Sequence, residues 1–207
     1  MNYKQQFYQI LNTEFSNCEK SIQLAIGAVM GTTGANAGLS IHKEVNTYSL
    51  EEVQIYPFTP FIIQNSFFVT AYSFFEYSFR KFCEIIVTDH SAFKRKLSDM
   101  DKVYQYYSLV SNILPLKENS IAEDWEALVV FREIRNIIVH YNSIVPGNTS
   151  LKTKTFLEYG KFLIPIGNGL IQIKEKMISE ILRIALRFLF NLIEAYANYY
   201  PHGVFSR

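Results

Sequence analysis

The sequence of 207 residues contains only two cysteines, Cys18 and Cys83, which lie far apart in the chain. This number and spacing exclude a disulfide framework and a Cys-x-x-Cys metal site. Six prolines and nine glycines are too few for a collagen-like or low-complexity chain. The scarcity of cysteine favours a reducing, cytoplasmic compartment.

The sequence also lacks an uninterrupted apolar run long enough to cross a membrane. Its two most apolar stretches, 61–75 and 181–193, are both interrupted by polar residues, whereas a membrane-spanning helix needs roughly 20 consecutive apolar residues. Residues 1–15 alternate polar and apolar side chains and lack the basic start and apolar block of a secretory signal. We therefore expect neither export nor membrane insertion.

The sequence contains 20 basic and 19 acidic residues, so neither charge dominates and the net charge is +1. A protein that mainly coats nucleic acid would be strongly basic, so the charge balance argues against that class.

The sequence has no HExxH, P-loop, GxGxxG or GxSxG motif and no paired Cys/His set, which excludes most motif-bearing enzyme classes. Apolar residues make up 49% of the chain, enough for the core of one domain.

The spacing of polar residues predicts a helical domain. In segment 175–200 polar residues recur every three or four positions and Pro201 follows, which is typical of a helix with a wide buried face. Segment 61–88 has the same pattern, and two such helices must pack against other helices. Further helices are predicted over 3–28 and 123–141, and one or two shorter ones over 91–114. Helix 123–141 has Ser120 as its expected N-cap and Glu123 and Asp124 in its first turn, where they complement the helix dipole.

Two segments do not fit helices. Residues 31–60 begin with the cluster Gly31-Thr32-Thr33-Gly34 and are expected to be irregular or extended. Residues 153–173 carry a hairpin signal around Gly167-Asn168-Gly169. The sequence thus predicts one domain over 1–207, an all-α up-and-down bundle of four long helices plus short helices, with a small β-hairpin insertion and a core over about 61–200.

Residues that can act on a phosphate gather within segment 131–142. On a regular helix, Arg135, Arg132, Asn136 and His140 fall in that order across an arc of about 140°. A guanidinium binds phosphate oxygens and does not ligate metals, and an imidazole exchanges a proton near neutral pH. This composition suits metal-free RNA cleavage, with the imidazole deprotonating the 2′-hydroxyl or protonating the leaving oxygen. Because Arg135 and His140 are far apart around the helix, they converge only if the helix is distorted or a second copy completes the site.

The run Arg135-Asn136-Ile137-Ile138-Val139-His140 resembles the R-x4-H motif of the HEPN superfamily (higher eukaryotes and prokaryotes nucleotide-binding). The helix that contains Ala71-Tyr72-Ser73-Phe74-Phe75-Glu76 resembles the second long helix of such proteins, which often carries an acidic residue. The resemblance covers about 61–200. It implies a helical bundle that dimerises with the two motifs facing each other, and a metal-independent endoribonuclease without a cofactor, typical of toxin–antitoxin and phage-defence systems. An antitoxin protein is a possible partner.

The resemblance also implies roles for individual residues. Arg135 would hold the scissile phosphate, His140 would be the general acid or base, and Asn136 would orient the phosphate or His140. Arg132, Glu76 and Tyr141 are our additional candidates for supporting the site or binding RNA. The family branch whose partner modifies a tyrosine has R-x4-H-x-Y, whereas Tyr141 here follows His140 directly, so this form of control does not fit.

Structural roles compete with these functional ones. Arg135 could pair with Glu133 or with a carboxylate of a neighbouring helix while His140 caps the end of its helix, and Glu76 could pair with Arg80 four residues on. Two other readings of the whole chain follow: a non-catalytic HEPN-like module that binds a nucleotide, RNA or a protein, and a plain helical scaffold in which the motif is an internal salt-bridge cluster.

Overall fold

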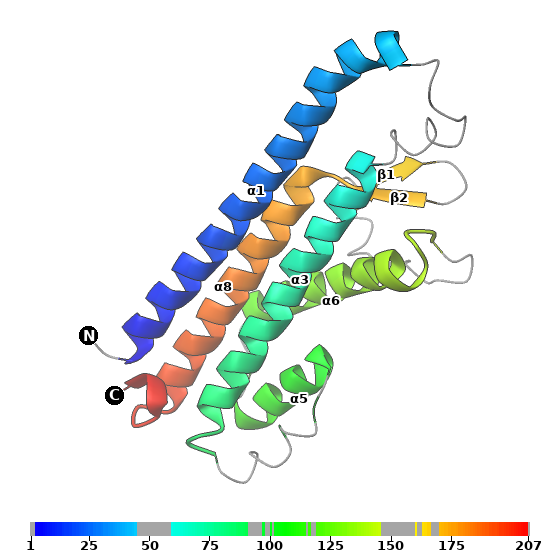
Figure 1. The fold of residues 1–207 in the computed structure, drawn as a ribbon. Helices are drawn as coiled ribbons and strands as arrows, with labels where there is room; N and C mark the ends of the chain where they lie inside the picture. The colour runs from blue at the N-terminus through cyan, green and yellow to red at the C-terminus, as the bar shows by residue number, and fades with distance from the viewer. Residues whose placement is uncertain are drawn as a thin grey trace.

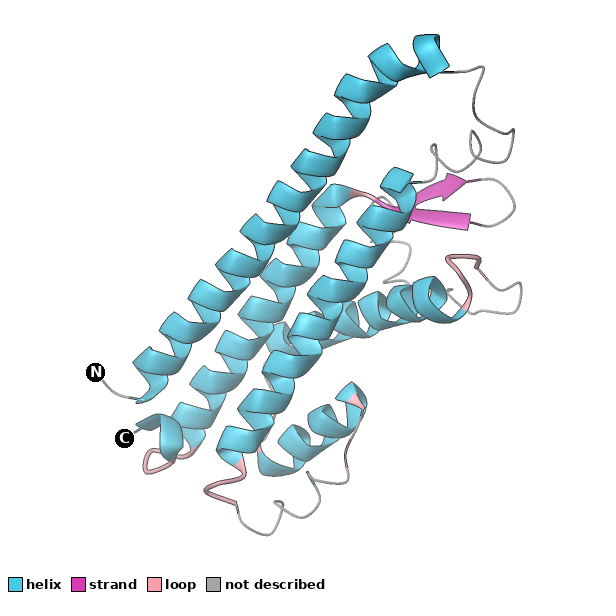
Figure 2. Cartoon of the chain, in the orientation of Figure 1, coloured by secondary structure: helices cyan, strands magenta, loops and turns pink. Residues whose placement is uncertain are grey.

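The computed structural model describes residues 3–44, 59–90, 97, 100, 102–114, 116, 119–145, 160, 163–166 and 170–206. Helices dominate this part of the chain, so the prediction of a predominantly helical protein is confirmed (Figure 2). The elements, in chain order, are α1 (Tyr3–Glu44), α3 (Thr59–Ile86), α5 (Val103–Ile113), α6 (Asn119–His140), β1 (Leu163–Ile166), β2 (Leu170–Ile173), α8 (Glu175–Tyr199) and the 3₁₀ helix η3 (Val204–Ser206). None of the described helices is both long and apolar enough to span a bilayer.

Helix α8 is the central element of the fold. It packs against α1, α3, α6 and η3, and Figure 1 shows α1, α8 and α3 side by side while α6 crosses behind them. Helix α1 runs opposite to α3 and α8 (Figure 1). Eleven residues of α8 are buried, whereas Lys176, Arg183, Arg187 and Glu194 of its predicted polar stripe are exposed. The polar period of the sequence therefore gave the orientation of this helix correctly.

Aromatic side chains fill the core between α3 and α8. Phe79 of α3 meets Phe188 of α8 edge to face with ring centroids 5.3 Å apart, and neither ring is exposed. Trp125 of α6 stacks on Tyr107 of α5 with centroids 3.9 Å apart. Since offset and edge-to-face pairs add to the free energy gained from burial, the buried aromatic residues of α3 stabilise the core and are not open to stack on nucleobases, whereas Tyr77 of the same helix is 55% exposed.

Helix α1 is longer than the sequence predicts. The predicted helix ends before the cluster Gly31-Thr32-Thr33-Gly34, but α1 continues through it to Glu44, so the expectation of irregular chain is wrong for 31–44. A glycine in a helix interior costs only about 1 kcal/mol, and no proline interrupts the chain before Pro57. Segment 45–58 lies outside the described residues.

Helix α6 begins earlier than predicted, at Asn119. Ser120 therefore lies inside the helix and is not its N-cap. Asp124, expected to complement the helix dipole in the first turn, is instead buried at 1% exposure and binds Arg187 of α8. Asp124 therefore forms an ion pair between α6 and α8 in place of the interaction with the dipole of its own helix that its place in the sequence suggests.

A short antiparallel sheet lies within the segment for which the sequence predicts a hairpin. Strands β1 and β2 pair in a register that sets Leu163 opposite Ile173 and Ile166 opposite Leu170. Residues 153–159 of the predicted hairpin segment and its predicted turn, Gly167-Asn168-Gly169, lie outside the described residues. Ile144, just beyond α6, forms an isolated bridge to Leu170, so the sheet is joined to the end of the helix that carries the motif.

Candidate phosphate-binding and acid–base site on α6

Arg135 is half-buried on α6 and lies beside Asn136. Its Nη1 donates a hydrogen bond to Asn136 Oδ1 at 3.2 Å, while its Nε is buried without a hydrogen-bond partner. Among the described residues no carboxylate lies within ion-pair distance of this guanidinium, so the expected pairing with Glu133 is not found; Glu133 lies instead 3.9 Å from Arg132 Nη1. A buried donor without an acceptor costs free energy.

Glu76 of α3 faces the two arginines of α6. Burial raises the pKa of the Glu76 carboxyl, and the positive charges of Arg135 and Arg132 lower it in part. The expected pair with Arg80 is wrong, because Arg80 Nε donates to Glu84 Oε1 at 3.2 Å. The structure therefore supports the proposal that Glu76 belongs to the surroundings of the motif, within electrostatic reach of both guanidiniums.

Tyr72, one turn before Glu76, is part of the same cluster. It is fully buried. Burial raises the pKa of its hydroxyl, Glu76 raises it further, and Arg132 and Arg135 oppose this rise. We did not single out Tyr72 from the sequence, although its place one turn before an acidic residue on a predicted buried face was a usable signal.

His140 is the last residue of α6 and its side chain is exposed. Within the described part of the chain, no hydrogen bond or ion pair joins its ring to another residue. Tyr141, the next residue, is 53% exposed. Arg132, Arg135, Asn136 and Glu76 are thus brought together within one chain, whereas His140 stands apart at the helix end, as the helical angle between Arg135 and His140 predicts.

The backbone after His140 turns sharply and is held in place. Asn142 and Ser143 have φ angles of 49° and 66°, a left-handed conformation that commonly ends helices. The N–H groups of Tyr141 and Ser143 both donate to the carbonyl of Ile137 at 3.1 Å. Since these bonds satisfy a carbonyl that the helix itself leaves open, the end of α6 is fixed where His140 is attached.

A buried amide links this turn to the rest of the fold. Asn65 of α3, 2% exposed, donates from Nδ2 to Ser143 Oγ at 2.9 Å and to the Ile171 carbonyl at 3.1 Å, and its Oδ1 accepts from the Ile173 N–H at 2.9 Å. The Ile171 N–H also donates to the Ser143 carbonyl at 2.9 Å. The position of Asn65 inside an apolar run of the sequence was the available signal, because buried polar groups nearly always have partners.

Other polar features of the fold lie apart from this cluster. A hollow of about 620 Å³ between α1 and α8 is lined by Asn12, Phe15, Glu180, Arg183 and their neighbours and contains none of the motif residues. In the described part of the chain, no three His, Cys, Asp or Glu side chains are grouped to hold a metal ion. The side chains gathered around the motif are thus two guanidiniums and an amide, with the carboxyl groups of Glu133 and Glu76 near them.

Comparison of the chain with protein-family models, with curated proteins and with solved structures found no match.

Proposed function

We propose that the protein is a metal-independent endoribonuclease of the HEPN type that acts as a toxin or phage-defence effector. The observation that carries the proposal is the state of Arg135: its guanidinium lies beside Asn136, is bound to no described carboxylate and retains a buried Nε without an acceptor. An arginine kept in this state is suited to a phosphate that forms part of the substrate.

The proposed reaction uses the side chains of α6. Arg135 binds the non-bridging oxygens of the scissile phosphate, and Asn136 holds the guanidinium in orientation. The 2′-oxygen loses its proton and attacks the phosphorus, the bond to the 5′-oxygen breaks, and that oxygen takes up a proton. His140 acts as the base that removes the first proton or the acid that supplies the second. The products are a 2′,3′-cyclic phosphate and a free 5′-hydroxyl.

The proposed active form is a homodimer in which two α6 helices face each other. Within one chain, Arg135 lies in a half-buried cluster and His140 is exposed at the helix end. A two-fold arrangement would set the His140 of one copy near the Arg135 of the other, because a two-fold interface uses the same surface on both subunits. His140, Tyr141 at 53% and Val139 at 43% exposure offer a surface for this contact.

The test is an RNA cleavage assay in excess EDTA with several RNAs, including total tRNA. Wild type is compared with His140→Ala and with His202→Ala, a matched control that removes another exposed histidine. We expect cleavage by wild type and by the control, no cleavage by His140→Ala, and products that end in a 2′,3′-cyclic phosphate. Equal cleavage by His140→Ala would contradict the proposal, and no cleavage by any protein would favour a non-catalytic binding module.

A further inference from the structure

Tyr104, in the first turn of α5, is an exposed aromatic ring with two cations close to it. Its side chain is 44% exposed. Arg132 Cζ lies 5.3 Å from the ring centroid and Lys102 Nζ lies 6.0 Å from it. Both distances are within the range over which a cation is attracted to an aromatic face. Two consecutive helices, α5 with the residue before it and α6, thus combine a planar ring with two positive charges.

The start of α5 is held firmly, so the ring has a fixed position. The Lys102 N–H donates to Gln105 Oε1 at 3.0 Å, and the Tyr106 hydroxyl donates to the Met100 carbonyl at 3.1 Å. Tyr106 and Val103 are buried in the core on either side of Tyr104. A ligand that stacks on Tyr104 would therefore lose little free energy to ordering this helix.

Arg132 connects this ring to the candidate site. The same guanidinium that approaches Tyr104 acts, together with Arg135, on the charge of Glu76 and on Tyr72. Its one acidic neighbour within ion-pair distance among the described residues is Glu133 at 3.9 Å, and both side chains are partly exposed. Such a pair contributes little, so Arg132 can turn its charge toward a ligand.

We propose that Tyr104, Arg132 and Lys102 form a subsite for a nucleotide of single-stranded RNA adjacent to the scissile phosphate. The base stacks on Tyr104 and the guanidinium plane of Arg132, and the phosphate of that nucleotide binds Lys102. Unpaired bases of RNA are recognised by stacking on aromatic rings and arginine planes beside a positively charged path for the backbone. The subsite rests on the proposed function, since it takes RNA as the substrate.

The test measures RNA binding in the absence of cleavage. A short fluorescein-labelled single-stranded RNA is titrated with His140→Ala protein and with the same protein carrying Tyr104→Leu, Tyr104→Trp or Tyr199→Leu, and Kd is read from fluorescence anisotropy. Tyr199 is the matched control, because it is 55% exposed at the end of α8 and contacts Tyr200. We expect Tyr104→Leu to raise Kd about 10-fold, within the range known for one stacked base, and Tyr104→Trp and Tyr199→Leu to leave it unchanged.

A second part of the experiment tests the proposed contact between Lys102 and the RNA phosphate. Lys102→Met should lower the slope of log Kd against log salt by about 1, because one phosphate contact is lost. The subsite is wrong if Tyr104→Leu and Tyr199→Leu bind RNA equally, or if no variant binds RNA. The two proposals fail separately: binding that depends on Tyr104 without cleavage by wild type contradicts only the ribonuclease, and cleavage that depends on His140 with binding indifferent to Tyr104 contradicts only the subsite.

Discussion

The Nδ2 of Asn65 lies 2.9 Å from the Oγ of Ser143, and this hydrogen bond joins the first half of α3 to the turn just after His140. The same amide makes two further bonds to the backbone of β2. One buried side chain therefore holds α3, the end of α6 and the sheet at fixed positions relative to one another, and the candidate acid–base residue is attached to the part that is held.

Asn65→Ala should lower the free energy of unfolding by about 2–4 kcal/mol, because it leaves buried donors and acceptors of Ser143 and β2 without partners. Urea denaturation measures this. Gln64→Ala is the control, since the side chain of the half-buried Gln64 has one hydrogen bond within the described part of the chain, accepted from Gln172 Nε2 at 2.7 Å. Its cost should be about 1 kcal/mol or less. Equal costs for the two variants would show that the three-way link does not stabilise the fold.

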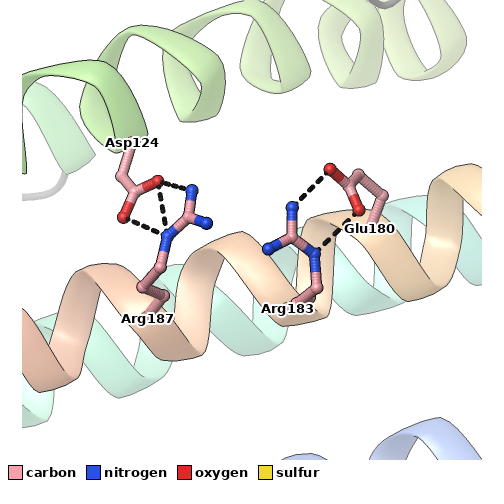
Figure 3. A network of polar contacts seen from close by, with 4 residues as sticks. All are labelled: Asp124, Glu180, Arg183 and Arg187. Atoms are coloured by element: carbon pink, nitrogen blue, oxygen red, sulfur yellow. Dashed lines mark hydrogen bonds and ion pairs between the residues drawn. The ribbon is translucent and has the colours of Figure 1, made fainter. Parts of the chain in front are cut away.

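Two arginines of α8 provide a matched comparison (Figure 3). Arg187 and Arg183 are about equally exposed, at 49% and 55%, but Asp124, the partner of Arg187, is 1% exposed whereas Glu180, the partner of Arg183, is 24% exposed. Arg187→Met should cost about 3 kcal/mol, because it leaves a buried carboxylate unpaired. Arg183→Met should cost less than about 1 kcal/mol.

The double variant Asp124→Leu/Arg187→Met checks the cause of that difference. If the loss in Arg187→Met comes from the unpaired carboxylate, replacing Asp124 as well should recover most of the stability. Thermal or urea unfolding of wild type, Asp124→Leu, Arg187→Met and the double variant completes this double-mutant cycle. A double variant as unstable as the sum of the two single ones would mean that Arg187 acts through other contacts.

Glu76→Gln should stabilise the protein at pH 7. Burial raises the pKa of this carboxyl above its ordinary value of 4.5 despite Arg135 and Arg132, so ionised Glu76 opposes folding, and its protonated form favours folding. The advantage of the Gln variant should shrink as the pH falls toward 4.5, where the unfolded chain also takes up the proton. Melting temperatures of both proteins between pH 4 and 8 measure this.

Glu84→Gln is the control and should change the stability at pH 7 in the opposite direction. The hydrogen bond from Lys81 lowers the pKa of the Glu84 carboxyl, and further interactions with Lys81 and Arg80 outweigh the opposing effect of burial. Its ionised form therefore stabilises the fold above pH 4.5, and this contribution is lost as the pH falls through the folded-state pKa. The Gln variant should be less stable than wild type at pH 7 and approach it in acid. Parallel behaviour of the two variants would contradict the claim that burial outweighs the attraction of Arg135 and Arg132 at Glu76.

Arg135→Gln should leave the melting temperature unchanged or raise it slightly. The substitution removes a buried Nε that has no acceptor and no ion pair with a described carboxylate, and residues kept for activity often lower stability. In a plain scaffold, where Arg135 would belong to an internal salt-bridge cluster, the same change should lower the melting temperature strongly. Differential scanning fluorimetry with Arg187→Met as the destabilised reference separates the two readings.

Mixing two inactive variants should restore RNA cleavage if the active site spans two copies. A heterodimer of His140→Ala and Arg135→Gln contains one composite site with both residues intact, so an equimolar mixture should reach about a quarter of wild-type activity after subunit exchange. Each variant alone should be inactive. If both variants are inactive alone and the mixture stays inactive although heterodimers form, the two residues act within a single chain.

The period of polar residues predicted α8 and α3 to within about two residues because their buried faces are wide and continuous. It failed at α1, where glycines were read as a helix end although a helix can continue through them at modest cost. For the site, the angle between Arg135 and His140 follows from helical geometry alone. The surroundings of Glu76 and the partner of Asp124 depend on how α3, α6 and α8 pack. Local spacing could suggest only Arg80 for Glu76 and the helix dipole for Asp124, and neither interaction is the one that the structure shows.

Strand β2 fixes the end of α6 through its register. Ile171 and Ile173 point into the core while their backbone groups bond Asn65 and Ser143. A slip of one residue would turn both isoleucines outward and remove these bonds together. A single residue added between Ile173 and Glu175 should therefore shift either the register of β2 or the start of α8. The short sheet thus sets the position of the end of α6, and with it the point from which His140 projects.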